Sequence, residues 1–344
     1  MPAKKNMVSN PSRRDFLQKT AWLSLGIAGG LKSASAFNSY GLNEGKPDSL
    51  INGVQIGVIT YSFRSLPGKP EQLVQYCVDA GISAIELMGD SIEDAAGKPV
   101  NRTVLPARIP GKPYQLSDEQ KAGMAAYQQE VADWRANVSM DKFVAIKKLF
   151  AKAGISIYAF KPNALGVNNT DAEIEYALRA AKALGAKSVT VELPNNNPAQ
   201  TKRLGDLAAK HKIYIGYHAH LQATDTAWDE ALSQSPWNSM NLDCGHYIAA
   251  GGTNSSESLL ALIEAKHDRI TSMHIKDRLT KANGGANKPW GEGNTPLKEI
   301  LTLLREKKYK IPATIELEYD IPAGSDAVQE TKKCLAFART ILEA

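Results

Sequence analysis

Imidazole and carboxylate side chains recur along the second half of the chain in four short motifs. Neutral imidazole together with carboxylate oxygen suits Mn²⁺, Zn²⁺, Co²⁺ or Fe²⁺ better than Ca²⁺, which prefers oxygen ligands alone. The pattern therefore predicts a site for one divalent metal ion, with Mn²⁺ favoured. The motifs, preceded by Glu192, are Tyr217-His218-Ala219-His220, Asp243-Cys244-Gly245-His246, His274-Ile275-Lys276-Asp277 and Glu316-Leu317-Glu318.

One residue from each motif can converge on a single ion. Residues two apart in a strand point to the same side, so His218 and His220 can both face the site. We assign His218 as the ligand and His220 as its neighbour or a substrate contact. The expected ligands are His218, Asp243, His274 and Glu316.

The motifs need elements that bring them together, and the sequence provides a regular alternation of such elements. Apolar runs rich in Val and Ile alternate with helix-like stretches, which is typical of repeated βα units. Eight runs favour a closed (β/α)8 barrel over an open sheet, and the motifs fall at the C-terminal ends of strands, where such barrels build their sites. The expected strands are Val54–Phe63, Ala84–Met88, Ser156–Lys161, Ser188–Leu193, Ile213–His220, Met240–Tyr247, Ile270–Lys276 and Ala313–Tyr319. The expected helices are Glu71–Ala80, Met140–Ala153, Asp171–Leu184, Pro198–His211, Ser255–Lys266, Pro296–Lys307 and Gly324–Glu343.

One segment interrupts this alternation. Roughly fifty residues, from Gly89 to Ser139, separate the second expected strand from the next helix, far more than a usual connection. We expect a lid or rim over the site, with a surface decoration or an interface arm as the alternatives. Trp134 and Arg135 in this segment are suited to stack on a sugar ring and to hydrogen-bond its hydroxyls, so both are candidate substrate contacts.

The N-terminal segment has the features of an export signal. A basic start, the apolar run Ala21–Ala28 and the small residues Ala34-Ser35-Ala36 match the three parts of a signal peptide. Ser12-Arg13-Arg14-Asp15-Phe16-Leu17 resembles a twin-arginine signal, which the twin-arginine translocase reads as an address. We therefore expect export to the periplasm or beyond after cleavage near Ala36. The predicted organisation is a signal at residues 1–36, a linker at 37–50 and a catalytic barrel at 51–344.

Charge and cysteine content narrow the function further. The first 36 residues hold six of the 41 Lys and Arg and one of the 36 Asp and Glu, so the remainder of the chain is neutral. A neutral chain argues against nucleic acid as a partner. Three cysteines at wide spacings, Cys77, Cys244 and Cys334, argue against a disulfide framework and against a thiolate zinc site.

From about Ile51 to its C-terminus, the chain resembles the xylose-isomerase-like barrels, which include sugar isomerases and epimerases, inosose dehydratases and endonuclease IV. The resemblance rests on Asp243–His246, on His274–Arg278, on Pro289–Pro296 and on Ile315–Glu318. It implies that Asp243, His274 and Glu316 are metal ligands, as in ketose 3-epimerases, whose fourth ligand is a second glutamate that shares the proton transfer. This chain has His218 where those epimerases have that glutamate. Trp290, within Pro289–Pro296, is a further expected substrate contact.

A metal ion that chelates a carbonyl and an adjacent hydroxyl makes the neighbouring C–H bond acidic and stabilises an enediolate. Reprotonation, proton relocation or loss of a leaving group can follow, so epimerase, isomerase and lyase share one site plan. The expected catalytic residues are Glu192, His220, Glu316 and Lys161, with His246 and Lys276 as substrate contacts.

We expect a sugar isomerase or epimerase acting on a non-phosphorylated sugar, since phosphorylated sugars are largely cytoplasmic. A 3-keto-glycoside 1,2-lyase working beside an oxidoreductase, and a non-catalytic carbohydrate-binding barrel, are the alternatives. A homo-oligomer is also compatible with the sequence.

Overall fold

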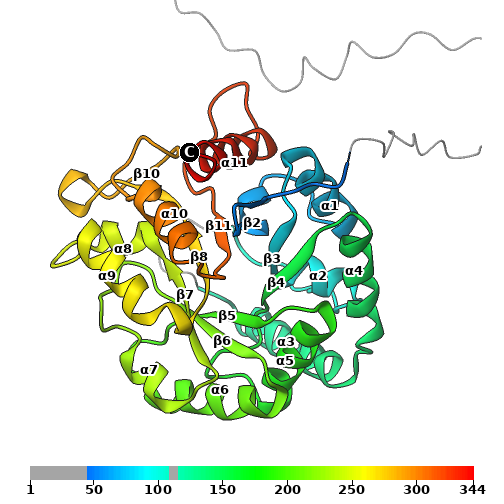
Figure 1. The fold of residues 1–344 in the computed structure, drawn as a ribbon. Helices are drawn as coiled ribbons and strands as arrows, with labels where there is room; N and C mark the ends of the chain where they lie inside the picture. The colour runs from blue at the N-terminus through cyan, green and yellow to red at the C-terminus, as the bar shows by residue number, and fades with distance from the viewer. Residues whose placement is uncertain (1–44, 108–114) are drawn as a thin grey trace, which may run out of the picture. The chain divides into compact units, whose positions relative to one another are not determined.

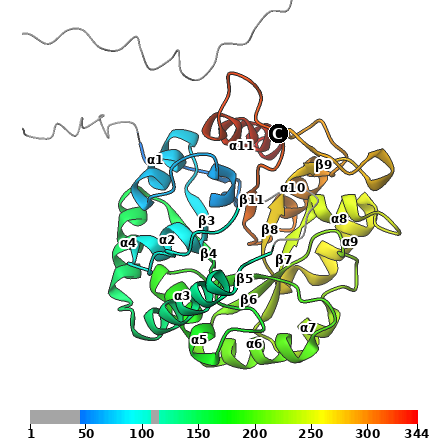
Figure 2. The same cartoon turned by 180° about the vertical axis from the view of Figure 1, so that it is seen from behind.

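A computed structural model describes residues 45–107 and 115–344. Eight parallel strands form a ring in the order β2-β11-β8-β7-β6-β5-β4-β3, which the pairing of β2 with β3 closes. Helices surround this ring (Figures 1 and 2). The predicted (β/α)8 barrel is confirmed. The strands of the ring are β2 (Val54–Ile59), β3 (Ala84–Met88), β4 (Ser156–Lys161), β5 (Ser188–Glu192), β6 (Tyr214–His218), β7 (Asn238–Asp243), β8 (Ile270–Ile275) and β11 (Ala313–Ile315).

Side chains pack into the interior of the barrel. Its strands are buried along most of their length, as expected for a parallel sheet covered by helices. Within the barrel, Tyr158 lies so close to Gly57 that a Cβ on the glycine would be 2.5 Å from the tyrosine oxygen. That oxygen also lies 2.7 Å from Thr314 Oγ1. A larger side chain at position 57 would therefore collide with the filling of the barrel.

The outer helices largely match the expected ones, and glycines end two of them. Gly81 and Gly185 follow α1 (Pro70–Ala80) and α5 (Asp171–Leu184) with φ angles of 80° and 83°, the left-handed conformation that glycine adopts without strain. The short helices α7 (Asp229–Gln234) and α8 (Cys244–Ala250) were not expected, because only six and seven residues form them. The helices outside the Gly89–Ser139 segment are α1 (Pro70–Ala80), α4 (Asp141–Lys152), α5 (Asp171–Leu184), α6 (Pro198–His211), α7 (Asp229–Gln234), α8 (Cys244–Ala250), α9 (Ser256–Lys266), α10 (Leu297–Glu306) and α11 (Ala327–Leu342).

Six expected strands extended too far at their C-terminal ends, three of them by four residues. Ser188–Leu193 and Ile270–Lys276 were one residue too long, and Ile213–His220 was two residues too long, so His220 lies beyond the end of β6. The run Met240–Tyr247 is wrong in its second half, because β7 ends at Asp243 and helix α8 begins at Cys244. Asp243 caps this helix by accepting a hydrogen bond of 2.7 Å from the His246 amide. The run Val54–Phe63 continues beyond β2 as a 3₁₀ helix, and the run Ala313–Tyr319 is strand only to Ile315.

The described part of the segment from Gly89 to Ser139 contains two helices, α2 (Gly89–Ala95) and α3 (Asp118–Asn137). Helix α3 is joined to α5 through an ion pair of 2.8 Å between Arg135 and Glu173. The ring of Trp134 also meets that of Tyr176 edge-on, with centroids 5.5 Å apart. Arg135 and Trp134 therefore attach this helix to the barrel. The lid role of the segment stays a prediction.

A two-stranded hairpin, β9 (Asp277–Arg278) and β10 (Asn287–Lys288), follows β8. The side chain of Asp277 accepts hydrogen bonds from the backbone amides of Gly291, Gly293 and Thr295, at 2.8–3.1 Å. One buried carboxylate thus fixes the loop that carries Trp290. This gives the aspartate of the His274–Asp277 motif a structural task.

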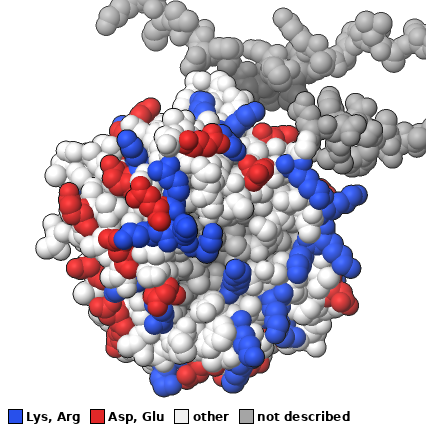
Figure 3. Space-filling model, viewed as in Figure 1, with Lys and Arg blue, Asp and Glu red and all other residues white. Residues whose placement is uncertain are grey.

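Three further findings concern the whole described chain. All three cysteines are free and buried, which agrees with the expected absence of a disulfide framework. Among the described residues, no helix is long and apolar enough to cross a membrane. Basic and acidic side chains are interspersed on the face of the molecule drawn in Figure 3. The expected signal at residues 1–36 and most of the expected linker lie outside the described residues.

Candidate functional site

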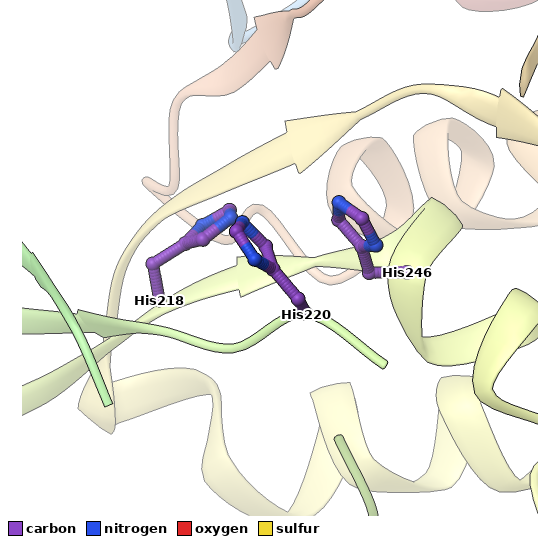
Figure 4. Close-up of side chains that lie close together, drawn as sticks. All are labelled: His218, His220 and His246. Atoms are coloured by element: carbon purple, nitrogen blue, oxygen red, sulfur yellow. The ribbon is translucent and has the colours of Figure 1, made fainter. Parts of the chain in front are cut away.

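The strand register brings the predicted ligands together. Asp243 on β7 pairs with His274 on β8, and His218 on β6 pairs with Asn241 on β7. Ligand atoms of His218, Asp243 and His274 lie within 4.8 Å of one another, and all three residues are buried. A second such group consists of His218, His220 and His246. Figure 4 shows these three rings lying close together, two from the end of β6 and one from α8.

His274 lies between two carboxylates. Its Nδ1 is 2.8 Å from Glu316 Oε2, and its Nε2 is 3.0 Å from Glu86 Oε2. Burial alone would lower the pKa of His274, but the charges of Glu316 and Glu86 raise it to about 10. Both ring nitrogens therefore carry a proton in the metal-free protein. Loss of the Nδ1 proton would free a ligand atom, while the Nε2 proton keeps the ring oriented through Glu86.

His218 is already in the form that a ligand needs. Its Nδ1 lies 2.8 Å from the side-chain oxygen of Asn241, whose amide nitrogen donates to Ser272 Oγ at 2.7 Å. The orientation of the amide means that Nδ1 holds the proton and Nε2 holds the lone pair. Burial and then the charge on His274 keep the pKa of His218 well below its usual value. Its Nε2 lies 3.8 Å from Asp243 Oδ2.

His246 is in the opposite tautomer from His218, with its proton on Nε2. The guanidinium of Arg278 lies 2.6 Å from His246 Nδ1 and can only donate, so Nδ1 accepts and Nε2 carries the proton. Burial lowers the pKa of His246 to about 4, which makes the neutral ring the relevant species. Its buried Nε2 has no hydrogen-bond partner among the described residues. This N–H is a free donor toward the site and cannot serve as a ligand, so the group of His218, Asp243 and His274 is the better metal site.

The two oxygens of Asp243 have separate tasks. Oδ1 caps α8, whereas Oδ2 lies 3.8 Å from His218 Nε2, 3.9 Å from His274 Nδ1 and 2.9 Å from Lys276 Nζ. The contact with Lys276 is close enough for an ion pair but has no hydrogen-bonding geometry, which leaves Oδ2 without a hydrogen bond among the described residues. An anionic oxygen in this condition is suited to a cation.

Lys276 adds a permanent positive charge to the same place. Its Nζ lies 2.6 Å from Glu316 Oε2 and 2.8 Å from Glu318 Oε2, in addition to Asp243. Burial alone would lower the pKa of Lys276, but these three carboxylates raise it. The pKa of Glu316, which burial alone would raise, is held well below its usual value by His274 and Lys276. Lys276 and Glu316 are therefore ionised at neutral pH.

Glu192, His220 and Lys161 form a more exposed group on the rim. Glu192 Oε1 lies 2.8 Å from Lys161 Nζ, and its Oε2 lies 3.6 Å from His220 Nε2. The side chains of Glu192 and His220 are 49% and 50% exposed, so they can meet a molecule that enters from solvent. Burial alone would raise the pKa of Glu192, but His218 and Lys161 lower it.

The contacts of the described residues do not bring all the predicted substrate contacts to this site. The contacts of Trp134 and Arg135 are with Tyr176 and Glu173, and none is with a residue of the histidine group among the described residues. The ring of Trp290 meets Phe337 of α11 edge-on, at 5.9 Å between centroids. His246 and Lys276 do lie in the group.

Four residues with clear tasks were missed by sequence reasoning, namely Glu86, Asn241, Arg278 and Glu318. Glu86 carried a usable signal, because it is a carboxylate in the otherwise apolar strand Ala84–Met88. Glu318 lies two residues beyond Glu316, so it could share its direction. Asn241 lies two residues before Asp243, and Arg278 ends the motif His274–Arg278, but neither position predicts which histidine the residue orients, since each acts on a histidine from a different element.

The donor set fits a divalent ion. It offers an imidazole lone pair on His218, an imidazole on His274, a hydrogen-bond-free oxygen on Asp243 and the carboxylate of Glu316. Mixed nitrogen and oxygen donors suit Mn²⁺, Co²⁺, Zn²⁺ or Fe²⁺.

Comparison with known proteins agrees with this architecture. The family model described as xylose isomerase-like TIM barrel matches residues 117–340. The comparison with curated proteins gave no match.

Several solved structures share the fold. A sugar phosphate isomerase/epimerase from Parabacteroides distasonis is 18% identical, with a TM-score of 0.54 over 83% of this chain and 93% of the other. D-psicose 3-epimerase from Clostridium cellulolyticum is 11% identical, with a TM-score of 0.56 over 85% of this chain and 100% of the other. A probable 3-DHS dehydratase from Bacillus anthracis is 16% identical, with a TM-score of 0.55 over 82% and 98%.

Proposed function

The chain belongs to the xylose isomerase-like TIM barrel family, and from this premise we propose that it is a divalent-metal-dependent isomerase or epimerase of a non-phosphorylated sugar. The observation that carries the proposal is the buried group of His218, Asp243 and His274, whose ligand atoms lie within 4.8 Å of one another beside Glu316. Structural neighbours that are described as epimerases support the same class of reaction. The reaction runs through an enediolate of the sugar.

The residues that would hold the ion are His218, Asp243, His274 and Glu316. When bound, a divalent ion supplies Lewis acidity toward a carbonyl and the hydroxyl beside it. The protein contributes the buried setting, in which each charge acts more strongly than it would in water. It also contributes the separate orientation of each imidazole by Asn241 and Glu86.

Two carboxylates stand at the ends of strands that lie on opposite sides of the ring. In the ring of eight strands, β5 and β11 are four strands apart in either direction, so Glu192 and Glu316 stand on opposite sides. An epimerisation needs a proton removed from one face of a carbon and another delivered to the opposite face. Glu192 therefore takes the role of the second glutamate, although it stands on β5 and the position expected for it on β6 holds His218.

Two donors are available for the developing negative charge on the sugar oxygens. The Nε2–H of neutral His246 is buried, oriented by Arg278 and free of other partners among the described residues. The ammonium of Lys276 lies beside it, and both are near Glu318. A fixed donor such as the His246 N–H stabilises an oxyanion without reorganisation during the reaction.

One observation favours the 3-keto-glycoside 1,2-lyase as the second candidate. His220 is half exposed and paired with Glu192, so it can exchange protons with a group that extends out of the mouth. A leaving aglycone needs such a proton donor on its oxygen. Under this reading, an oxidoreductase supplies the 3-keto substrate.

The test follows free ketoses, aldoses and 3-keto-glycosides by NMR with metal-loaded protein in deuterated water. We expect deuterium at the carbon beside the carbonyl and a second sugar as product. Glu192→Gln should stop this exchange while metal content stays at the wild-type level. Release of an aglycone would favour the lyase instead, and unchanged compounds with no bound or restorable metal would favour a carbohydrate-binding barrel.

We further propose that residues 1–36 direct export through the twin-arginine translocase and are removed near Ala36. A protein that acts outside the cytoplasm would meet free sugars and glycosides, which matches the substrate class above. Fractionation of expressing cells tests this, with Arg13→Lys/Arg14→Lys as the variant. Retention of that variant in the cytoplasm is the expected result, and unchanged export would contradict it.

A further inference from the structure

Lys276 contacts two carboxylate oxygens that are proposed above as ligands of the divalent ion. Its Nζ lies 2.9 Å from Asp243 Oδ2 and 2.6 Å from Glu316 Oε2, and both residues are assigned above as ligands. A divalent ion bound to the same two oxygens would be within contact distance of the ammonium. Two cations at such a distance repel each other strongly in a buried setting. The ion and this position of Lys276 therefore exclude each other.

We propose that Lys276 is a resident counter-cation, which the divalent ion displaces from Asp243 and Glu316 and which then remains on Glu318. This inference rests on the proposed function only for the identity of the ligands. It assigns separate tasks to the two carboxylates of the Glu316-Leu317-Glu318 motif. Glu316 binds the ion, and Glu318 receives the displaced ammonium.

The geometry around Glu318 fits this task. Its Oε2 lies 2.8 Å from Lys276 Nζ, so one of the three contacts can persist while the other two break. The side chain of Glu318 is 22% exposed, against 0% for Asp243 and 7% for Glu316, so it is the outermost of the three carboxylates. Lysine has a flexible four-carbon stem that allows such a movement.

The resident ammonium has a clear benefit for the metal-free protein. Asp243 and Glu316 are buried, and buried carboxylates without a counter-charge are strongly disfavoured. Lys276 neutralises them until an ion arrives. It also weakens the affinity for the ion, because part of the binding free energy is spent on the displacement. After displacement, the ammonium lies toward the mouth, next to the free N–H of His246.

The test measures Mn²⁺ affinity by isothermal titration calorimetry on metal-free protein, so that no activity is needed. Lys276→Met should bind Mn²⁺ at least tenfold more tightly than the wild type, because the ion meets no competitor. Lys161→Met is the matched control: it removes the same charge from the same mouth, but Lys161 contacts Glu192 and neither of the two ligands. This control should stay within threefold of the wild type.

Glu318→Gln keeps Lys276 and provides a second test if Lys276→Met does not fold. We expect it to bind Mn²⁺ severalfold more weakly, because the displaced ammonium has lost its acceptor. Equal affinities of the wild type and Lys276→Met, or tighter binding by Glu318→Gln, would overturn the displacement while leaving the metal site intact. Absence of Mn²⁺ binding in the wild type and in both variants would overturn the displacement and the metal dependence together.

Discussion

The inner group and the rim group of the mouth differ in how firmly they are held. In the inner group, Asp243, His274 and Glu316 are buried and contact one another or Lys276 at short distances. In the rim group, Glu192 and His220 are about half exposed. Preorganised charges suit metal binding and the stabilisation of charge, whereas accessible ones suit proton exchange with a substrate that comes and goes.

We therefore expect the two groups to have different functions. Removal of an inner residue should change metal affinity first and activity as a consequence. Removal of a rim residue should change turnover or product while metal binding persists. Metal affinity and activity, measured on the same variants, therefore test the division directly.

Asp243→Asn should have the largest effect. Asparagine caps helices as well as aspartate does, so α8 should remain, but the anionic oxygen that faces His218 and His274 is lost. We expect the Mn²⁺ affinity to fall by about a hundredfold or more, and activity with it, judged against the 10–100-fold cost of losing a supporting residue. Titration calorimetry and circular dichroism measure affinity and helix content. Wild-type affinity in a folded variant would contradict the assignment of Asp243 as a ligand.

The next largest effect should come from pH. Because the pKa of His274 is raised to about 10, the ion must displace one proton from it throughout the neutral range. His218 is neutral there and Glu316 is ionised, since both pKa values are lowered. The Mn²⁺ affinity should therefore rise about tenfold per pH unit from pH 6.5 to 8.5. An affinity independent of pH would show that His274 stays protonated and is no ligand.

The raised pKa of His274 also makes the stability of the metal-free protein depend on pH. The pKa of His274 is higher in the folded than in the unfolded chain, so its contribution to stability is complete below about pH 6.5 and is lost as the pH rises toward 10. The melting temperature without metal should fall across this window. His274→Gln should flatten that dependence, and an unchanged slope in the variant would contradict it.

Glu86→Gln should have a smaller effect of the same kind. Glu86 orients His274 and raises its basicity without touching the ion. Glutamine keeps an acceptor oxygen but removes the charge, so we expect about a tenfold loss of Mn²⁺ affinity, at the low end of the range for supporting residues. The control is Glu173→Gln, another buried carboxylate, which pairs with Arg135 on α3. That control should affect thermal stability and leave Mn²⁺ affinity within twofold.

Much of the barrel could be predicted from its sequence, because strand burial and helix periodicity are local properties. Helices α5 and α6 and strands β3 and β4 begin and end where the pattern placed them. The errors lie at strand ends, as in Met240–Tyr247. There, a capping contact of Asp243 decides where the helix begins, and hydrophobicity does not reveal it.

The inner group was more predictable than the residues that support it. His218, Asp243, His274 and Glu316 stand in motifs whose spacing matches strand ends. Glu86 acts on His274 from a strand far away in the sequence, and only the closure of the ring brings the two side chains together. The segment containing Trp134 was the hardest to interpret, because an aromatic residue beside an arginine serves helix packing as well as sugar binding.

The smallest expected effect belongs to the rim, where His220→Gln separates the two candidate reactions. If the protein is an epimerase with Glu192 and Glu316 as its proton carriers, the loss of His220 should reduce turnover less than fivefold, because its contact with Glu192 is long at 3.6 Å and open to solvent. Mn²⁺ affinity should not change, since His220 contacts none of the inner carboxylates within the described chain. Should His220 instead protonate a leaving aglycone, the variant would lose glycoside cleavage by more than a hundredfold and still exchange deuterium into the sugar. That result would show that a residue of the rim group, His220, carries out the decisive proton transfer.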